Sequence, residues 1–164
     1  MIQVISGFPG VGKSSMPKQI ELDGKTYEVV DLESTPYSWM LDDEGDRDRN
    51  PEFPFNYTDA IKEHVKQGHL VLVSSHQEVR DALLNEEIPH MVVYPALTLK
   101  REYMQRYKNR GNDEAFLKLV AGQWYNWIED LENESDVELP VDVIYAKISS
   151  PDMYLQDVIE MAFK

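Results

Sequence analysis

Five short apolar runs set the pattern of hydrophobic positions along the chain. Each run is nearly continuous, which is typical of strands in a parallel sheet that is buried on both faces. The runs are residues 2–5, Tyr27 to Leu32, Leu70 to Val73, Met91 to Tyr94 and Val141 to Tyr145. We therefore expect five strands, the first of which leads directly into a glycine-rich segment.

Stretches with helical periodicity fill the intervals between these runs. Gly68 ends one of them, Ser75 and Glu78 have the spacing of a capping box, and Ser150-Pro151 opens the last. Pro17 is expected to kink or shorten the first helix unless it lies in the first turn. The expected helices cover residues 13–22, 57–67, 75–83, 98–109 and 113–133, with a final helix after residue 150.

The resulting order, βαβαβαβααβα, predicts a three-layer, doubly wound α/β fold. Its five-stranded parallel sheet should bind a ligand at the carboxyl ends of the strands. The length of 164 residues indicates a single domain, 1–164. Residues 42–55 mix charges, prolines and a glycine without periodicity, so we expect a long functional loop there. One helix carries an apolar stripe expected to face the core: Phe116, Leu119, Val120, Trp124, Trp127, Ile128 and Leu131.

Composition narrows the classes of function. The net charge of −14 argues against a nonspecific nucleic-acid partner, but it is compatible with a small anion in a local basic pocket. Cysteine is absent, so disulfides, thiolate metal sites and cysteine nucleophiles are excluded. No apolar run approaches about 18 residues, so we expect no transmembrane helix, and no signal peptide is expected. The absence of cysteine, of a long apolar run and of an expected signal peptide fits a cytoplasmic location. The composition indicates no particular oligomeric state.

The segment from Gly7 to Ser14 matches the phosphate-binding pattern G-x-x-x-x-G-K-[ST], between an expected strand and an expected helix. Glycines let successive backbone N–H groups point at one phosphate, and the helix N-terminus adds a positive dipole. Lys13 would contact the β and γ phosphates, and the Ser14 hydroxyl would contact Mg²⁺. The ATP-binding residues predicted here are Gly7, Pro9, Gly10, Val11, Gly12, Lys13, Ser14 and Ser15.

The rest of the chain separates the classes of protein that carry this loop. No Asn-Lys-x-Asp guanine signature is present, which argues against a GTPase. The third strand runs into Ser74, Ser75 and His76, where a Walker B motif would place acids, which argues against an AAA-type ATPase. A small kinase therefore fits best.

Several segments resemble the nucleoside-monophosphate-kinase and gluconate-kinase group of P-loop kinases. They are Gly7 to Ser15, Val71 to Leu83, Val93 to Gly111 and the following helix, so the resemblance covers most of the chain. The chain is also similar to small nucleotide kinases of bacteriophages, which would place it in a host cytoplasm. The resemblance implies a P-loop kinase fold with a small lid over residues 101–118. It also implies that Arg106 lies near the adenine or phosphates and Arg110 near the transferring phosphoryl group.

The spacing of Arg106 and Arg110 places both on one face of a helix. A solvated basic helix face is the alternative reading. Their surroundings favour an anion site, because six of the 16 basic residues fall between positions 100 and 118: Lys100, Arg101, Arg106, Lys108, Arg110 and Lys118.

Asp31 ends the second strand, where it could accept the proton of a substrate hydroxyl. A turn or N-cap role before Ser34 and Thr35 is the alternative, and Glu33 is a weaker candidate base. Acceptor contacts are predicted at Ser34, Tyr37, Trp39, His76 and Arg80, with residues 42–67 as the acceptor-binding region. The alternatives are core packing for the two aromatics, a helix cap for His76 and an ion pair for Arg80.

These features predict an ATP- and Mg²⁺-dependent phosphotransferase that acts on a small acceptor, with a nucleoside or nucleoside monophosphate first. A sugar acid or a modified base in DNA is the next acceptor to consider. The competing classes are a nucleotide-dependent ATPase or switch with a protein or DNA partner, and a protein that only binds nucleotide.

Overall fold

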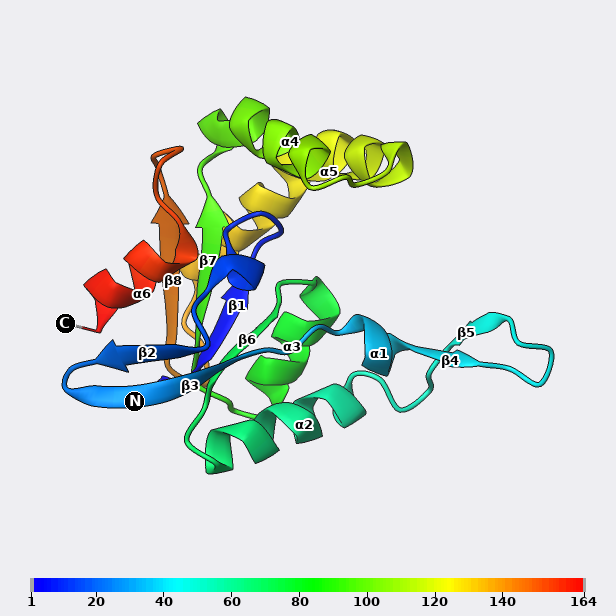
Figure 1. Cartoon of the computed structure of the whole chain (residues 1–164), viewed down its shortest axis with the longest axis horizontal. Coiled ribbons are helices and arrows are strands. Elements are labelled where there is room, and N and C mark those ends of the chain that lie inside the picture. The colour runs from blue at the N-terminus through cyan, green and yellow to red at the C-terminus, as the bar shows by residue number, and fades with distance from the viewer. Residues whose placement is uncertain (1, 164) are drawn as a thin grey trace.

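A six-stranded sheet forms the centre of the molecule, with the strand order β2-β3-β6-β1-β7-β8 (Figure 1). The computed structural model describes residues 2–163. The strands are β1 (Val4–Gly7), β2 (Gln19–Leu22), β3 (Lys25–Asp31), β6 (Leu70–Ser74), β7 (His90–Pro95) and β8 (Val143–Ile148). All neighbours are parallel except the edge pair β2–β3. The predicted α/β class and the five parallel strands are confirmed, with one antiparallel strand added.

Helices cover both faces of this sheet. Side chains alternate along β6, so that Leu70 and Leu72 belong to one core cluster while Val71 and Val73 belong to the other. The first cluster includes side chains of α4 (Lys100–Asn109), α5 (Glu114–Ser135) and α6 (Leu155–Ala162). The second includes side chains of α2 (Phe55–Lys66) and α3 (Gln77–Asn85). No helix in residues 2–163 is long and apolar enough to cross a membrane.

The helix predicted over residues 13–22 is wrong. Only a 3₁₀ turn, η1 (Lys13–Ser15), follows the glycine loop, and β2 comes next. The residue before a proline avoids helical backbone angles, and Met16 before Pro17 is extended (φ −65°, ψ 143°). The chain then turns at Asp23-Gly24, where both residues have positive φ (48° and 77°), as the type I′ turn of a two-residue hairpin requires.

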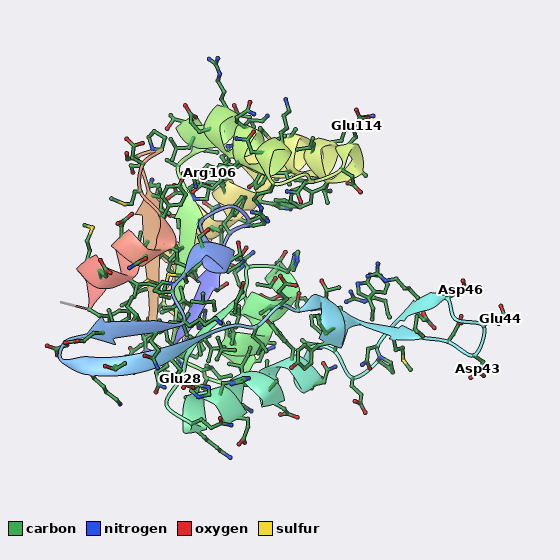
Figure 2. All side chains as sticks on the ribbon, viewed as in Figure 1. Glu28, Asp43, Glu44, Asp46, Arg106 and Glu114 are labelled. Carbon is green, nitrogen blue, oxygen red and sulfur yellow. The ribbon has the colours of Figure 1, made fainter. Side chains whose placement is uncertain are left out.

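The segment 42–55 is not a wholly irregular loop. After α1 (Thr35–Ser38), strands β4 (Trp39–Leu41) and β5 (Arg47–Arg49) form a separate hairpin that projects from the body (Figure 1). Its tip carries Asp43, Glu44 and Asp46 (Figure 2). The Asp42 carboxylate accepts from the N–H groups of Glu44 (2.9 Å) and Asp46 (2.8 Å), which orders the turn.

Some predicted helix ends and core positions also differ. His76, not Ser75, occupies the N-cap of α3, so the predicted capping box is wrong. Helix α6 begins at Leu155, where Tyr154 and Asp157 form the capping box that the structure contains. Leu119 was expected in the core but is 52% exposed, because its side of α5 borders a surface hollow. A short 3₁₀ turn, η2 (Leu97–Leu99), precedes α4.

Candidate functional site

The glycine loop follows β1, which lies between β6 and β7 in the sheet. Backbone bonds anchor it on both sides: Phe8 N–H donates to the Val93 carbonyl (2.9 Å), and Leu155 N–H donates to the Val11 carbonyl (2.8 Å). Gly10 and Gly12 adopt φ of 89° and 112°, and a Cβ at Gly10 would lie 2.9 Å from the Tyr107 ring. Glycine is therefore required at Gly10 by both backbone angle and space.

The amides that follow are available to a ligand. Among the hydrogen bonds within residues 2–163, none is donated by the backbone N–H groups of Gly12, Lys13 or Ser14. Successive N–H groups of this kind form a concave site for an anion.

A cleft of about 260 Å³ opens beside the loop at the carboxyl ends of β1, β3 and β6. It brings together eight of the residues predicted for the site: Pro9, Gly10, Lys13, Ser14, Asp31, Ser34, His76 and Arg110. Glu33, named only as a weaker candidate base, also lines the cleft.

Two cations and two carboxylates determine the electrostatics of this cleft. The Lys13 ammonium donates to the Gly7 carbonyl, and burial lowers the pKa of Lys13 to about 8. Asp31 and Glu33 oppose that shift in the pKa of Lys13, while Arg110 adds to it. Burial raises the pKa of Asp31 above its ordinary value, and Lys13 limits the rise. The arrangement suits a polyanion at Lys13 and Arg110 and a proton acceptor at Asp31.

Tyr57 holds two walls of the cleft together and was not predicted as a site residue. Its hydroxyl donates to the Leu32 carbonyl after β3 and accepts from the Ser74 N–H (3.3 Å) at the end of β6. The ring is fully buried against Tyr37, with 5.2 Å between the ring centroids. The sequence placed Tyr57 inside the predicted acceptor-binding region, residues 42–67, but assigned no contact to its hydroxyl.

Arg106 does not line the cleft. It points from α4 toward the glycine loop (Figure 2) and donates to the carbonyls of Gly10 and Pro151, both at 2.7 Å. Its guanidinium lies over the rings of Tyr103 and Tyr154, 4.3 and 4.2 Å from their centroids. Arg106 thus fastens the glycine loop to the segment between β8 and α6, and it does not belong to a solvated basic helix face.

Arg80 has a partner within the protein. It is only 6% exposed, forms an ion pair with Glu134 of α5 and donates from Nε to the Ser75 carbonyl (2.9 Å). The structure therefore shows Arg80 in an ion pair, which was the alternative to a contact with the acceptor. Glu134 lies 54 positions away in the chain, so helical spacing could not reveal the pair.

Trp39 lines a second hollow of about 320 Å³, next to the cleft and sharing Ser34, Thr35 and His76 with it. The indole is 38% exposed and lies under the guanidinium groups of Arg47 and Arg49 (4.6 and 5.3 Å). Arg49, which sequence reasoning missed, also pairs with Glu78 of α3 (2.9 Å) and so ties the hairpin to the body. Tyr37, in contrast, packs on Tyr57.

His76 lines the cleft and the Trp39 hollow. Burial lowers the pKa of His76, and the charges of Lys13 and Arg80 lower it further. The imidazole is therefore neutral near pH 7 and offers one donor and one acceptor to a ligand.

Further lining residues were missed. Ser74 and Ser75 follow a predicted strand, so the rule that sites lie at strand ends could have found them. Asn112 lies in the turn between α4 and α5, and Phe116 lies in the first turn of α5. Only tertiary packing brings these two residues to the cleft.

Comparison of the chain with protein-family models, with curated proteins and with solved structures finds no match. Within residues 2–163, no three His, Cys, Asp or Glu side chains are arranged to hold a metal ion by themselves. Functional conclusions therefore rest on the geometry of the cleft.

Proposed function

We propose that this protein is an ATP-dependent phosphotransferase with a P-loop kinase-like fold, acting on a nucleoside or nucleoside monophosphate. The observation that carries the proposal is the convergence of Lys13 and Arg110 with Asp31 and Glu33 beside the unused amides of residues 12–14 in the glycine loop. The central position of β1, with the loop at its carboxyl end, supports it.

The triphosphate of ATP would lie on the loop amides with Lys13 at its β and γ phosphates. An oxygen of the acceptor attacks the γ-phosphorus, the bond from that phosphorus to the β–γ bridging oxygen breaks, and ADP leaves. Arg110 would stabilise the charge of the transferring group, a role worth roughly 10³ to 10⁵ in rate. Asp31 takes the proton when the acceptor is a hydroxyl, whereas a phosphate acceptor needs no base.

The oxygen donors around Lys13 fit Mg²⁺. This ion keeps several waters and takes one or two carboxylates plus substrate phosphates, so it needs no cage made entirely of protein. The Ser14 hydroxyl and the carboxylates of Asp31 and Glu33 line the cleft and match that preference. When bound, the ion would offset the negative charge of the phosphates.

The decisive experiment is an ATP-consumption screen with Mg²⁺ against nucleosides, nucleoside monophosphates and gluconate, with controls that lack an acceptor. ADP release that depends on the acceptor is the expected result, and Lys13→Ala should abolish it while melting stays cooperative. Lys66→Ala, an exposed lysine on α2 outside the cleft, is the matched control and should stay active. Slow ADP release that is independent of every acceptor would favour an ATPase or switch instead.

A further inference from the structure

A third hollow, of about 380 Å³, adjoins the cleft between the glycine loop, α3 and α5. The two cavities share Pro9, Ser75, His76 and Phe116, so a ligand in the cleft can extend into the hollow. Its apolar walls are formed by Phe8, Phe116, Leu119, Trp127 and Leu131. We call it the aromatic hollow.

We propose that the aromatic hollow binds the base of the acceptor, which is therefore a nucleoside or nucleotide, while the reacting oxygen lies in the cleft. This inference rests on the proposed function and names the group that the acceptor must carry. The Phe8 and Trp127 rings meet at 69° with 6.3 Å between their centroids, and Trp127 is only partly buried. A flat heterocycle is the kind of group that aromatic walls of this type bind by stacking.

The charges of the hollow disfavour a phosphate. The cation in its wall, Arg80, is already neutralised by Glu134, and Asp130 adds a carboxylate at the rim. Lys13 and Arg110 line the cleft instead, and within residues 2–163 neither has a carboxylate partner at hydrogen-bond distance. The charged end of the acceptor should therefore lie in the cleft and its neutral end in the hollow.

The polar groups of the hollow match the edge of a base. Gln77 offers an amide donor and acceptor, Asp130 offers an acceptor, and Arg80 retains N–H donors beyond those used on Ser75 and Glu134. Purines and pyrimidines present donors and acceptors in one plane, so a few such groups can select among them. Gln77 and Asp130 are therefore the specificity-determining residues in this proposal.

A base bound in the aromatic hollow would explain why Leu119 is exposed in the protein without a ligand. A leucine that is 52% exposed beside Phe116 and Trp127 leaves apolar surface in water until a ligand covers it. The hollow at Trp39 is more polar, because three hydroxyls and the Arg49–Glu78 ion pair line it. A neutral ring is therefore better placed in the aromatic hollow than against Trp39, which the sequence also predicted to contact the acceptor.

The test fills the hollow without disturbing the core. Leu119→Trp adds bulk at an exposed position, and Glu129→Trp adds the same bulk at an exposed position of α5 outside the hollow. Binding of nucleoside monophosphates and of ribose 5-phosphate, which lacks a base, is measured by calorimetry without ATP. Leu119→Trp should weaken binding of the preferred nucleotide at least about tenfold and leave ribose 5-phosphate unchanged. Glu129→Trp should bind both ligands like the unaltered protein.

Trp127→Ala should raise the KM for the acceptor about 10- to 100-fold and leave the KM for ATP unchanged. An effect of Trp39→Ala on nucleotide binding, with none from Leu119→Trp, would overturn the inference. So would equal affinity for ribose 5-phosphate and the nucleotide.

These outcomes separate the two proposals. Acceptor-dependent ADP release that Leu119→Trp does not alter would leave the kinase standing and remove the base from the hollow. Nucleotide binding that Leu119→Trp blocks, in a protein with no acceptor-dependent ADP release, would support the hollow as a base site and refute the kinase.

Discussion

Arg106 and Arg110 lie four residues apart on or next to α4, yet their side chains have different surroundings. Arg110 is the C-cap residue of α4 and lines the cleft. We expect Arg110→Ala to lower kcat by roughly 10³, because a charge-stabilising arginine acts mainly in the transition state. Its thermal midpoint should stay within about 1 °C of the unaltered protein. Steady-state kinetics and thermal melting test this, and an unchanged kcat would remove Arg110 from the reaction.

Arg106→Ala should act in the opposite way, mainly on stability. It removes two hydrogen bonds to carbonyls and the contacts with Tyr103 and Tyr154. We expect the thermal midpoint to fall by about 5 °C, and the KM for ATP to rise because Gly10 loses its tether. Arg106→Lys should recover only part of both effects, since an ammonium cannot bridge two carbonyls from one plane. A variant that melts normally but loses kcat would instead place Arg106 at the phosphates.

At the scale of residues, the sequence predicted correctly those cleft residues whose position follows from a local motif. The eight predicted residues that meet in the cleft include Gly10, Lys13 and Ser14 from the loop and Asp31 from a strand end. Residues that depend on distant partners were assigned less well. Arg80 was predicted to contact the acceptor, with an ion pair as the alternative, and the structure shows an ion pair with a glutamate 54 positions away.

At the scale of elements, the β2–β3 hairpin replaces the helix expected after the glycine loop. Gly24 at its turn has φ 77° with open space around it, whereas Gly122 lies within α5, also with open space. Gly24→Ala should therefore lower stability by about 1 kcal/mol through backbone strain. Gly122→Ala, the matched control, should raise stability by up to about 1 kcal/mol through helix propensity. Denaturant unfolding measures the change in the free energy of unfolding for both variants. Changes of the same sign in the two variants would contradict the hairpin.

The same hairpin shows why element prediction partly failed. Buried strands such as β6 and β7 were found because their apolar runs are continuous. In residues 19–22 only Ile20 and Leu22 are buried, a pattern too short to separate a strand from a helix by periodicity alone. Two local signals could have decided between a strand and a helix. The pair Asp23-Gly24 favours a tight hairpin turn, and Pro17 disfavours a helix at the residues before it.

At the scale of the whole molecule, function and stability conflict at Lys13. The chain carries a net charge of −14, so an anionic substrate meets repulsion everywhere except near local cations. The cleft supplies such a cation by holding Lys13 partly buried, which costs free energy whenever the ammonium is protonated. Removing the charge should therefore stabilise the fold while it abolishes phosphate binding.

Lys13→Met should raise the thermal midpoint at pH 7 by several degrees, since a pKa lowered from 10.5 to about 8 corresponds to a penalty on the order of 3 kcal/mol. Because folding lowers this pKa, the unfolded chain binds more protons between about pH 8 and 10.5. The stability of the unaltered protein relative to Lys13→Met should therefore rise across that window, and the advantage of the variant should shrink. Melting both proteins from pH 7 to 10 cancels effects of the remaining charges, because they are common to both. A difference that stays constant with pH would mean that Lys13 is not desolvated in the folded protein.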